Sequence, residues 1–363
     1  MKFSNIYYIA EIFLPSKSAY SIHVMKMCNA FAKKKISTDL YIYNKNNNLN
    51  FFDQYNCIKK FKIHSLNIKK NNFFARVLFA LKILKLILPK KNSLIISRSV
   101  LTAILLNFFK NNVILELHHE LTGLTKYFFL LCKNFSSFKK LKIIFISNNL
   151  RNHFKLKGNK TIILDDGVDL DNFKFKKKHK IKKKTCGYFG SFAKGKGIEN
   201  IIDISKFNKN IFYDLYGDFQ NSNFSKDSFK SFKNIKYKGY LKYKNIPQTL
   251  SKYDILLLPY SSKVYVRSKS IETSKYMSPL KLFDYMASKK IIVASKMNVY
   301  KHILNKKNSV LIDPGSPNIW ANEIENVFNN LNKYKKLGNS ANKLVKKYTW
   351  DNRINKIIRF SNV

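Results

Sequence analysis

The segment from Ser278 to Lys290, S-P-L-K-L-F-D-Y-M-A-S-K-K, combines residues that start a helix with residues that can bind polar ligands. Ser278 is a good N-cap and Pro279 suits a first helical position, so the pattern predicts a helix that begins here. The free N–H groups and the positive dipole end at Ser278 would attract an anion such as a diphosphate. Asp284 follows roughly 9 Å further along the helix axis, which is close to the span from a nucleotide's phosphates to its ribose hydroxyls.

A second candidate is the run from Gly190 to Gly197, G-S-F-A-K-G-K-G, which follows an expected strand and opens an expected helix. It nearly spells a P-loop, but Gly197 stands where a P-loop has the Ser or Thr that binds magnesium. A Gly-rich turn that brings the backbone and Lys196 up to a diphosphate is the better functional interpretation. The alternative is a tight strand-to-helix turn with a solvated lysine.

Histidines supply a third candidate. His118 and His119 stand at the end of the expected strand V-I-L-E-L, where the ligands of parallel sheets gather. A histidine there can polarise a hydroxyl or support a leaving group, and Glu116 precedes it. A buried structural histidine is the competing interpretation. His23, in the first turn of the helix after the first strand, is similarly placed, and packing explains it nearly as well.

The sequence gives little reason to expect a metal. Asp169 and Asp171 form a D-x-D pattern, which binds metals in a different transferase fold, but a turn built from Asp166 and Gly167 explains this segment. The cysteines form no C-x-x-C pair, which predicts reduced thiols and no zinc site. They are Cys28, Cys57, Cys132 and Cys186.

Composition needs careful weighing, because the formal net charge is +47, from 68 Lys and Arg against 21 Asp and Glu. Such a charge normally indicates nucleic acid or an anionic membrane as partner. Nearly all of it is Lys, in a chain also rich in Asn, Ile, Phe and Tyr, which is typical of AT-rich codons. Arg, which reads bases and phosphates bidentately, is scarce. We therefore expect mostly solvated lysines, no nucleic-acid partner, and a weaker attraction to acidic lipid head groups.

The length of 363 residues is that of two domains. Short β-branched or aromatic runs alternate with longer helical patterns, which predicts βαβ units and parallel sheets with helices on both faces. We expect an α/β chain of two tandem Rossmann-like, doubly wound domains with a ligand cleft between them. The first domain would span 1–165, a hinge 166–184 and the second domain 185–344, and an amphipathic helix over 345–363 would pack back on the first domain.

The expected strands of the first domain are Phe3 to Ala10, Asp39 to Tyr43, Leu94 to Ser97, Val113 to Leu117, Ile143 to Ile146 and Thr161 to Leu164, with one more short strand within 44–72. Those of the second domain are Cys186 to Phe189, Phe212 to Tyr216, Ile235 to Lys238, Asp254 to Pro259, Ile291 to Ala294 and Val310 to Ile312. Helices are expected from near Ser21, over Gly197 to Ser205, and from a Ser316 cap with Pro317 first.

The longest apolar segment, Phe73 to Leu88, carries Arg76, Lys82 and Lys85, and is too short and too charged to span a membrane convincingly. Two interpretations stay open: a helix with one face buried in its domain, or a basic amphipathic helix lying on the inner membrane surface. The N-terminal apolar run is interrupted by polar residues and suits a buried strand better than a signal peptide. We expect a cytoplasmic protein with peripheral contact to the inner face of the plasma membrane.

With these segments placed, the chain resembles the glycosyltransferase family 4 group of GT-B enzymes over nearly its whole length. It is most similar to bacterial members with an S-P-L-K-L-F-E-Y-M-A signature that act on surface polysaccharides. Five segments in the same order carry the resemblance: P-S-K-S-A-Y-S-I-H-V-M-K-M-C-N-A-F-A from Pro15, D-G-V-D-L from Asp166, G-S-F-A-K-G-K-G from Gly190, S-P-L-K-L-F-D-Y-M-A from Ser278, and Y-T-W from Tyr348.

The resemblance implies a GT-B fold and a retaining, metal-independent transfer from a nucleoside-diphosphate sugar, which is a substrate, so no cofactor is expected. Lys196 would neutralise the leaving diphosphate and His118 would approach the sugar. Asp284 would hold the ribose, and the loop at Gly239 and Tyr240 would lie near the base. The whole implied donor set is Gly190, Ser191, Lys196, Gly239, Tyr240, Ser278, Pro279, Leu280 and Asp284. Ser21 and His23 are expected on the acceptor side.

Three positions depart from the family pattern. Ser191 replaces the basic residue often found after the first glycine, so Lys196 would carry more of the phosphate charge alone. In the family's E-x7-E pair the first position is Tyr276 and the second is Asp284, which weakens the expected contact with the sugar's far hydroxyls. Ala19 and Tyr20 replace a Gly-Gly before the first helix.

The leading hypothesis is sugar transfer to a saccharide or lipid-linked acceptor in bacterial surface polysaccharide or lipopolysaccharide synthesis. One alternative is a nucleotide-sugar epimerase or hydrolase of the same fold, which would turn over donor without acceptor. The alternative from another class is a basic nucleic-acid-binding protein, which would bind strands with a steep salt dependence.

Overall fold

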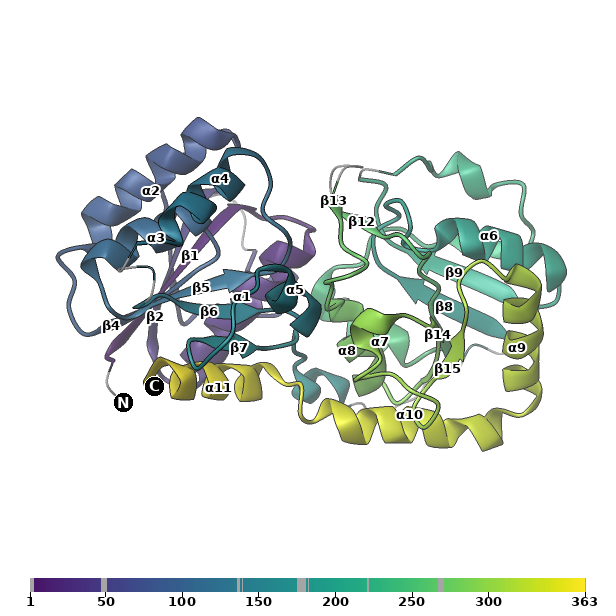
Figure 1. The fold of residues 1–363 in the computed structure, drawn as a ribbon. Helices are drawn as coiled ribbons and strands as arrows, with labels where there is room; N and C mark the ends of the chain where they lie inside the picture. The colour runs from purple at the N-terminus through teal and green to yellow at the C-terminus, as the bar shows by residue number, and fades with distance from the viewer. Residues whose placement is uncertain are drawn as a thin grey trace. The chain divides into compact units, whose positions relative to one another are not determined.

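The chain divides into two compact units, one made of residues 1–166 with 350–363 and the other of residues 167–349. The computed structural model describes residues 3–46, 51–135, 138, 140–174, 181, 183–220, 222–266 and 271–362. Each unit is a parallel sheet covered by helices (Figure 1). Of the expected basic hinge, residues 175–180 and 182 lie outside the described part.

In the first unit, the described strands form a seven-stranded sheet of order β3-β2-β1-β4-β5-β6-β7, with every neighbouring pair parallel. Every residue of β4 and β5 is buried, as expected for strands covered on both faces. The strands are β1 (Asn5–Leu14), β2 (Ser37–Lys45), β3 (Lys62–Ser65), β4 (Ser93–Ser97), β5 (Val113–Leu117), β6 (Lys142–Phe145) and β7 (Thr161–Ile163).

The helices of this unit are α1 (Ala19–Lys33), α2 (Phe73–Ile87), α3 (Val100–Phe109), α4 (Gly123–Cys132), α5 (Asn148–His153) and α11 (Trp350–Asn362), with a 3-10 turn η1 at Asp53–Tyr55. Helix α1 packs against α11, while α2, α3 and α4 lie side by side (Figure 1). Helix α1 begins earlier than the sequence predicted, because the hydroxyl of Ser18 accepts the Ser21 N–H and caps the first turn.

The second unit has a six-stranded sheet in its described part, of order β10-β9-β8-β11-β14-β15, again all parallel. The strands are β8 (Thr185–Phe189), β9 (Phe212–Tyr216), β10 (Ile235–Tyr237), β11 (Ile255–Leu258), β14 (Ile291–Ser295) and β15 (Val310–Ile312), with an antiparallel pair β12 (Tyr265–Val266) and β13 (Ile271–Glu272). The helices are α6 (Ile198–Phe207), α7 (Ile246–Leu250), α8 (Leu280–Ala287), α9 (Pro317–Asn329) and α10 (Leu331–Val345), and the 3-10 turns are η3 (Leu170–Phe173), η4 (Asp227–Phe229), η5 (Tyr243–Asn245) and η6 (Asn298–Tyr300).

The predicted fold class, two parallel-sheet α/β domains, is confirmed, but the start of the key helix needs correction. Helix α8 begins at Leu280, and Pro279 is its N-cap, with an extended backbone at φ −77° and ψ 121°. Ser278 therefore precedes the cap instead of forming it, and it is buried. A proline with extended ψ still suits the position, because it has no N–H to leave unpaired.

Helix α10, which the sequence did not predict, packs against α8, and its Gly338 lies against the segment that follows α8. A Cβ on Gly338 would lie 2.5 Å from the carbonyl oxygen of Lys289 and 2.9 Å from that of Lys290. Gly338 thus has a packing role in a helix interior, where glycine alone costs about 1 kcal/mol relative to alanine.

Replacing this glycine should destabilise the protein even though alanine is the better helix former. We expect Gly338→Ala to lower the free energy of unfolding by about 1–3 kcal/mol, because the methyl group must displace backbone. The matched control is Asn339→Ala on the exposed side of the same helix, which should leave stability unchanged or slightly raised. Chemical denaturation measures both, and a Gly338→Ala variant as stable as wild type would contradict the close approach.

Candidate functional site

The glycine-rich turn after β8 is held in place by very close backbone contacts. Gly195 and Gly197 have φ of +78° and +97°, in the region that favours glycine. A Cβ on Gly195 would lie 2.0 Å from the Lys263 carbonyl oxygen, and one on Gly197 would lie 2.1 Å from that of Pro259. The two glycines are therefore required by sterics, and they fix the backbone of Lys196 between them.

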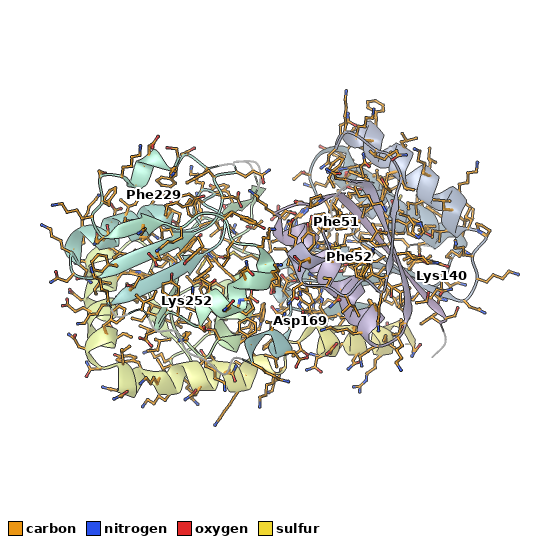
Figure 2. The ribbon with its side chains drawn as sticks, turned by 180° about the vertical axis from the view of Figure 1, so that it is seen from behind. Phe51, Phe52, Lys140, Asp169, Phe229 and Lys252 are labelled. Atoms are coloured by element: carbon orange, nitrogen blue, oxygen red, sulfur yellow. The ribbon has the colours of Figure 1, made fainter. Side chains whose placement is uncertain are left out.

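An aromatic cluster packs against the same turn. Phe192 is buried, with its ring centroid 5.2 Å from that of Phe219 and 5.9 Å from that of Phe229, which Figure 2 labels. Tyr188, at the end of β8, donates its hydroxyl to the carbonyl oxygen of Ser191 at 2.9 Å. Ser191 thus contributes a main-chain contact to the turn, and no basic side chain.

Two lysines converge beside this turn. The Nζ of Lys196 lies 5.2 Å from the ring centroid of Tyr260, and the Nζ of Lys281, on α8, lies 4.6 Å from the same ring. Lys281 also lies 4.0 Å from the centroid of Tyr188. A Cβ built on Gly190 would be 3.2 Å from the Lys281 Nζ, so the first glycine of the turn leaves room for this ammonium group.

The two lysine side chains lie in the same buried environment, where little water reaches their ammonium groups. Burial lowers the pKa of Lys196 to about 8. Burial, and then the charge of Lys196, lower the pKa of Lys281 well below its usual range. Within the described residues, the buried Nζ of Lys281 has no hydrogen-bond partner. A bound anion would supply the missing counter-charge and raise both pKa values again.

Sequence reasoning missed Lys281. Ser191 leaves the predicted phosphate site without one basic side chain, and Lys281 on the facing helix was not predicted to replace it. The available signal was the position of Lys281 directly after the predicted helix start, on the same side of the helix as Asp284.

Asp284, one turn further along α8, is only 4% exposed. Its Oδ1 accepts a hydrogen bond from the Tyr243 hydroxyl at 3.0 Å. A ribose hydroxyl at this carboxylate would therefore share it with Tyr243. Tyr276, at the position of the missing carboxylate, is buried as well.

The predicted base-side loop lies just before Tyr243. Gly239 has φ of +85°, and a Cβ there would meet no atom within 4 Å. Its carbonyl oxygen accepts the N–H of Gly217 at 3.1 Å, and Gly217 itself lies against Gly190. Tyr240 is partly buried, which raises the pKa of its hydroxyl. The predicted donor residues thus lie in the loops after the carboxyl ends of β8 and β10 and in or just before the first turns of α8. Parallel sheets bind ligands at the carboxyl ends of their strands.

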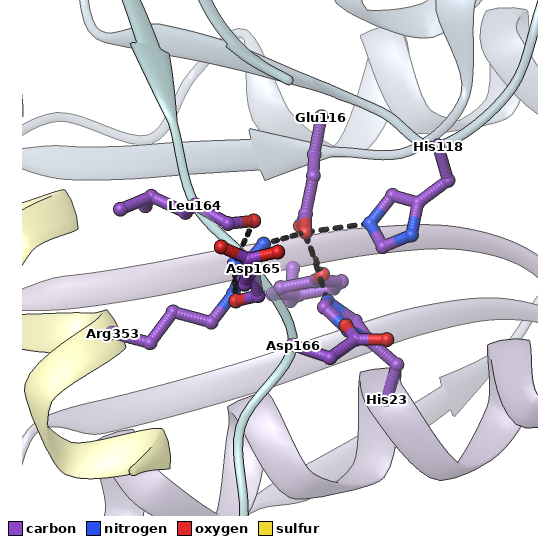
Figure 3. Close-up of polar contacts among 8 residues, drawn as sticks. His23, Glu116, His118, Leu164, Asp165, Asp166 and Arg353 are labelled. Atoms are coloured by element: carbon purple, nitrogen blue, oxygen red, sulfur yellow. Dashed lines mark hydrogen bonds and ion pairs between the residues drawn. The ribbon is translucent and has the colours of Figure 1, made fainter. Parts of the chain in front are cut away.

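In the first unit, Glu116 of β5 is the centre of a buried polar network (Figure 3). Its Oε1 lies 2.9 Å from His23 Nε2, 2.8 Å from His118 Nε2 and 2.5 Å from an Arg353 nitrogen. Its Oε2 accepts the Tyr8 hydroxyl at 2.7 Å. Glu116 thereby joins the first strand, the first helix, the loop after β5 and the C-terminal helix α11.

The network continues from His23 to Asp166 and from Arg353 to the main chain. His23 Nδ1 lies 2.7 Å from Asp166 Oδ1, and Arg353 also donates to the carbonyl oxygens of Leu164 and Asp165 (Figure 3). Sequence reasoning singled out His23 and His118 but not Arg353, whose partners lie about half the chain away.

Charge states in this network follow from its contacts. Burial alone would raise the pKa of Glu116, but His23 and Arg353 hold it well below its usual range. Burial, followed by the Arg98 charge, lowers the pKa of His118 to about 3, so this imidazole is neutral near neutral pH. Its Nε2 faces the Glu116 carboxylate and donates to it, which leaves Nδ1 as the acceptor nitrogen.

A metal at this network would compete with existing hydrogen bonds. Ligand atoms of His23, His118 and Asp166 lie within 4.8 Å of one another, so they could approach one ion. His23 Nδ1, however, is already hydrogen-bonded to Asp166, and His118 Nε2 to Glu116. His23 Nε2 lies 2.9 Å from Glu116 Oε1 but makes no hydrogen bond within the described residues. Ser21, the other residue expected on the acceptor side, is fully buried, and its hydroxyl lies 3.0 Å from that of the cap residue Ser18.

The D-x-D pair has ordinary local partners. Asp169 is the N-cap of η3, and Asp171 forms an exposed ion pair with Lys174 at 2.7 Å. These contacts agree with the interpretation of this segment as a turn.

Comparison with known proteins adds a family match in the second unit. Residues 169–344 match the family model for Glycosyl transferases group 1, and this range contains both lysines and α8. The match supports a glycosyltransferase. No curated protein matches the chain in sequence.

Solved structures resemble the chain over nearly its whole length. A glycosyltransferase from Rickettsia africae ESF-5 has a TM-score of 0.77 at 14% identity, covering 100% of this chain and 98% of its own. HepE from Anabaena, solved with UDP and glucose, has a TM-score of 0.73 at 13% identity, covering 98% and 99%. WaaG, a glycosyltransferase involved in lipopolysaccharide biosynthesis, has a TM-score of 0.65 at 11% identity, covering 97% and 99%. At such identities the similarity establishes the fold, which is that of GT-B glycosyltransferases.

The Arg353–Glu116 pair should stabilise the first unit measurably. We expect Arg353→Met to lower the free energy of unfolding at pH 7 by about 3–5 kcal/mol, because it leaves a buried carboxylate without its cation. Arg359→Met, at an exposed position of the same helix, should change it by less than about 0.5 kcal/mol.

The pH dependence separates loss of this pair from loss of packing. A carboxylate with a lowered folded-state pKa stabilises the fold above its unfolded pKa, and this contribution fades as the pH falls below that value. Urea denaturation should therefore show a smaller difference between Arg353→Met and wild type at pH 4 than at pH 7. Equal stability of the two arginine variants at pH 7 would rule out the proposed anchoring.

Proposed function

We propose that this protein transfers a sugar from a nucleoside-diphosphate sugar to a saccharide or lipid-linked acceptor. The observation that carries the proposal is the pair formed by Lys196 and Lys281, two ammonium groups near one tyrosine ring. A diphosphate carries two or more negative charges in a small volume. It would therefore supply the counter-charge that the two lysines lack. The family match over residues 169–344 points to the same chemistry.

The chemical step would depend on electrostatic stabilisation of the departing diphosphate. Negative charge grows on the leaving phosphate oxygen as the bond to the sugar breaks, and preorganised cations nearby lower the energy of that transition state. Lys196 and Lys281 would supply those cations, and the first N–H groups of α8 would add to them. The second lysine replaces the basic side chain that Ser191 does not provide.

The donor would lie along α8. Its diphosphate would sit at the lysine pair with Gly190, Ser191 and the helix start at Ser278, Pro279 and Leu280, and its ribose would reach Asp284. The base would lie towards Gly239 and Tyr240. HepE, which has this fold, was solved with UDP and glucose, so a UDP-hexose is the first donor to test.

Retention of anomeric configuration and independence from metal are further parts of the proposal. Lys196 and Lys281 would supply the positive charge that a metal ion supplies to the diphosphate in a metal-dependent transferase. His118 is proposed to contact the transferred sugar, since it is a neutral imidazole whose Nε2 is oriented by Glu116. His23 is proposed for the acceptor side. We place the protein in family 4 and in surface polysaccharide synthesis at the cytoplasmic face of a membrane, a context that WaaG's role in lipopolysaccharide biosynthesis supports.

Product analysis tests the function and separates it from its alternatives. The protein is incubated with UDP-, GDP- and ADP-hexoses, with and without a panel of saccharide and lipid-linked acceptors, in buffer containing EDTA. Transfer predicts release of nucleoside diphosphate that depends on the acceptor, persists in EDTA, and yields a glycoside with the donor's anomeric configuration by proton NMR. A new nucleotide sugar, or free sugar released equally without acceptor, would replace this proposal by epimerisation or hydrolysis.

Each lysine of the pair should be needed for donor binding and turnover. We expect Lys196→Met and Lys281→Met each to weaken UDP binding and lower kcat by about 10- to 100-fold, since each removes a charge-assisted contact to phosphate. Lys194→Met, an exposed lysine of the same turn, should stay within about twofold of wild type in both. Calorimetric titration with UDP and initial-rate assays provide the numbers.

A stability measurement guards this test against simple unfolding. Lys281→Met removes an unpaired buried ammonium group, so its melting temperature without nucleotide should equal or exceed that of wild type. UDP affinity of Lys281→Met equal to that of Lys194→Met would refute the role of the pair.

A further inference from the structure

Large apolar side chains on the surface are concentrated on one face of the first unit. Of the fourteen that are exposed among the described residues, eleven lie between Phe74 and Phe135, on α2 and α4 and at or next to the ends of α3 and α4. The other three, Phe13, Phe207 and Ile319, are scattered. A single exposed apolar residue needs no explanation, but a cluster of this size marks an interaction surface.

Helix α2 shows how the cluster arises. Its buried stripe contains Phe79, Ile83 and Ile87, and packs into the unit. A second stripe, at Phe74, Leu78 and Leu81, follows the same helical spacing on another side and is 82%, 48% and 53% exposed. The helix is therefore apolar on two sides, and only one of them has a partner within the described structure.

Helices α3 and α4 continue this exposed face. Helix α2 packs beside α3, and α3 beside α4 (Figure 1). Phe109 at the end of α3 is 64% exposed, and Tyr127 and Leu131 on α4 are 70% and 66% exposed. We call the surface formed by α2, α3 and α4 the α2–α4 face.

The charged side chains of the three helices themselves are all basic. The sequences of the three helices contain no Asp or Glu, whereas they and the residues that follow them carry lysines. Exposed examples are Lys85, Lys90, Lys126 and, at the edge of the unit in Figure 2, Lys140. Helix α6 of the other unit mixes both signs, with Glu199, Asp203 and Lys206, and helix α9 carries Glu323 and Glu325 but no lysine or arginine.

A partner for this face must be both apolar and negatively charged. A second copy of the face would bring lysines against lysines with no carboxylate on the three helices to neutralise them. An anionic bilayer offers lipid tails to the Phe and Leu side chains and head groups to the lysines, which can extend to the interface. No helix in the described ranges is long and apolar enough to cross a bilayer, so contact here would be along the surface.

We propose that the α2–α4 face docks on the surface of an anionic lipid bilayer. The docking itself does not depend on the proposed function. Only its suggested role, which is to bring the enzyme to a lipid-linked acceptor, rests on that function. Of the two interpretations of Phe73 to Leu88 that the sequence left open, the structure shows the buried face, and our proposal assigns the exposed side to the membrane.

Vesicle flotation of the full chain tests the docking. The vesicles contain phosphatidylcholine alone or with about one-third phosphatidylglycerol. We expect binding to the anionic vesicles at least tenfold tighter than to the neutral ones. The triple variant Phe74→Ser, Leu81→Ser, Leu131→Ser should bind anionic vesicles at least tenfold more weakly than wild type, and Lys85→Glu, Lys126→Glu should behave likewise.

Matched variants in the other unit control for general effects of polarity and charge. Phe207→Ser, Ile319→Ser replaces exposed apolar residues, and Lys333→Glu, Lys336→Glu replaces exposed lysines. Both should bind anionic vesicles within twofold of wild type. If they lose binding as strongly as the face variants, or if the face variants bind like wild type, the assignment of the face is wrong.

Two further readouts complete the test. The triple variant should keep the wild-type affinity for UDP, so that a failure of docking is distinguishable from a failure of the proposed function. Light scattering of the free protein reports on a second copy as the occupant. A wild-type dimer that the triple variant converts to a monomer, together with no vesicle binding by wild type, would overturn the membrane assignment in favour of self-association.

Discussion

The second unit is organised around two positive charges held close together with too little to neutralise them. Lys196 is fixed by a turn whose glycines touch neighbouring backbone. Lys281 is fixed by helix α8, whose buried side chains share one core cluster with strands β11 and β14. The faces of Tyr188 and Tyr260 offset part of the cost, since aromatic rings attract cations, but only by about 0.5–2 kcal/mol each. Such an arrangement lowers stability and is expected where a ligand supplies the missing charge.

The first unit treats its buried charge in the opposite way. Glu116 has Tyr8, His23, His118 and Arg353 around it, so its charge is matched and its oxygens are hydrogen-bonded. Contacts shared in this way fix geometry, because moving Glu116 would break its contacts with all four residues. It holds His118 in one orientation and ties the C-terminal helix α11 to strand β5. One unit thus contains an unmatched pair of charges that suits ligand binding, and the other a matched network that suits positioning.

The elements that local pattern specifies were predictable from the sequence. Strands β5 and β9 were predicted to the residue, because each is a short run of mainly apolar and aromatic residues. Helix α9, with Ser316 before Pro317, was also predicted correctly. Helix α10 was missed because most of its residues are polar, and only Leu337, Gly338, Ala341 and Val345 are buried. The start of α8 was displaced because Ser278 and Pro279 also suit the two positions immediately before a helix.

The candidate site was predictable only as far as single segments carry it. Lys196 and Asp284 stand in recognisable motifs, and the structure places them on neighbouring elements of one unit. The importance of Lys281 depends on Tyr260, a residue of another loop, and that of Arg353 depends on Glu116, on another strand. Contacts of this kind depend on tertiary packing. The spacing of apolar residues in the sequence predicts helices and strands but not which of them pack together. The exposed stripe of α2 was likewise ambiguous until its other side was seen to be buried.

The central claim is that Lys196 and Lys281 form one site for a diphosphate, and NMR of the lysine side chains tests it most directly. In protein labelled with 15N-lysine, the two Nζ signals are assigned from Lys196→Arg and Lys281→Arg and followed over pH with and without UDP. The account predicts that Lys281 titrates far below the other lysines in the free protein, that Lys196 titrates near pH 8, and that UDP raises the pKa of both. Ordinary lysine pKa values in the free protein, or values that UDP leaves unchanged, would contradict it.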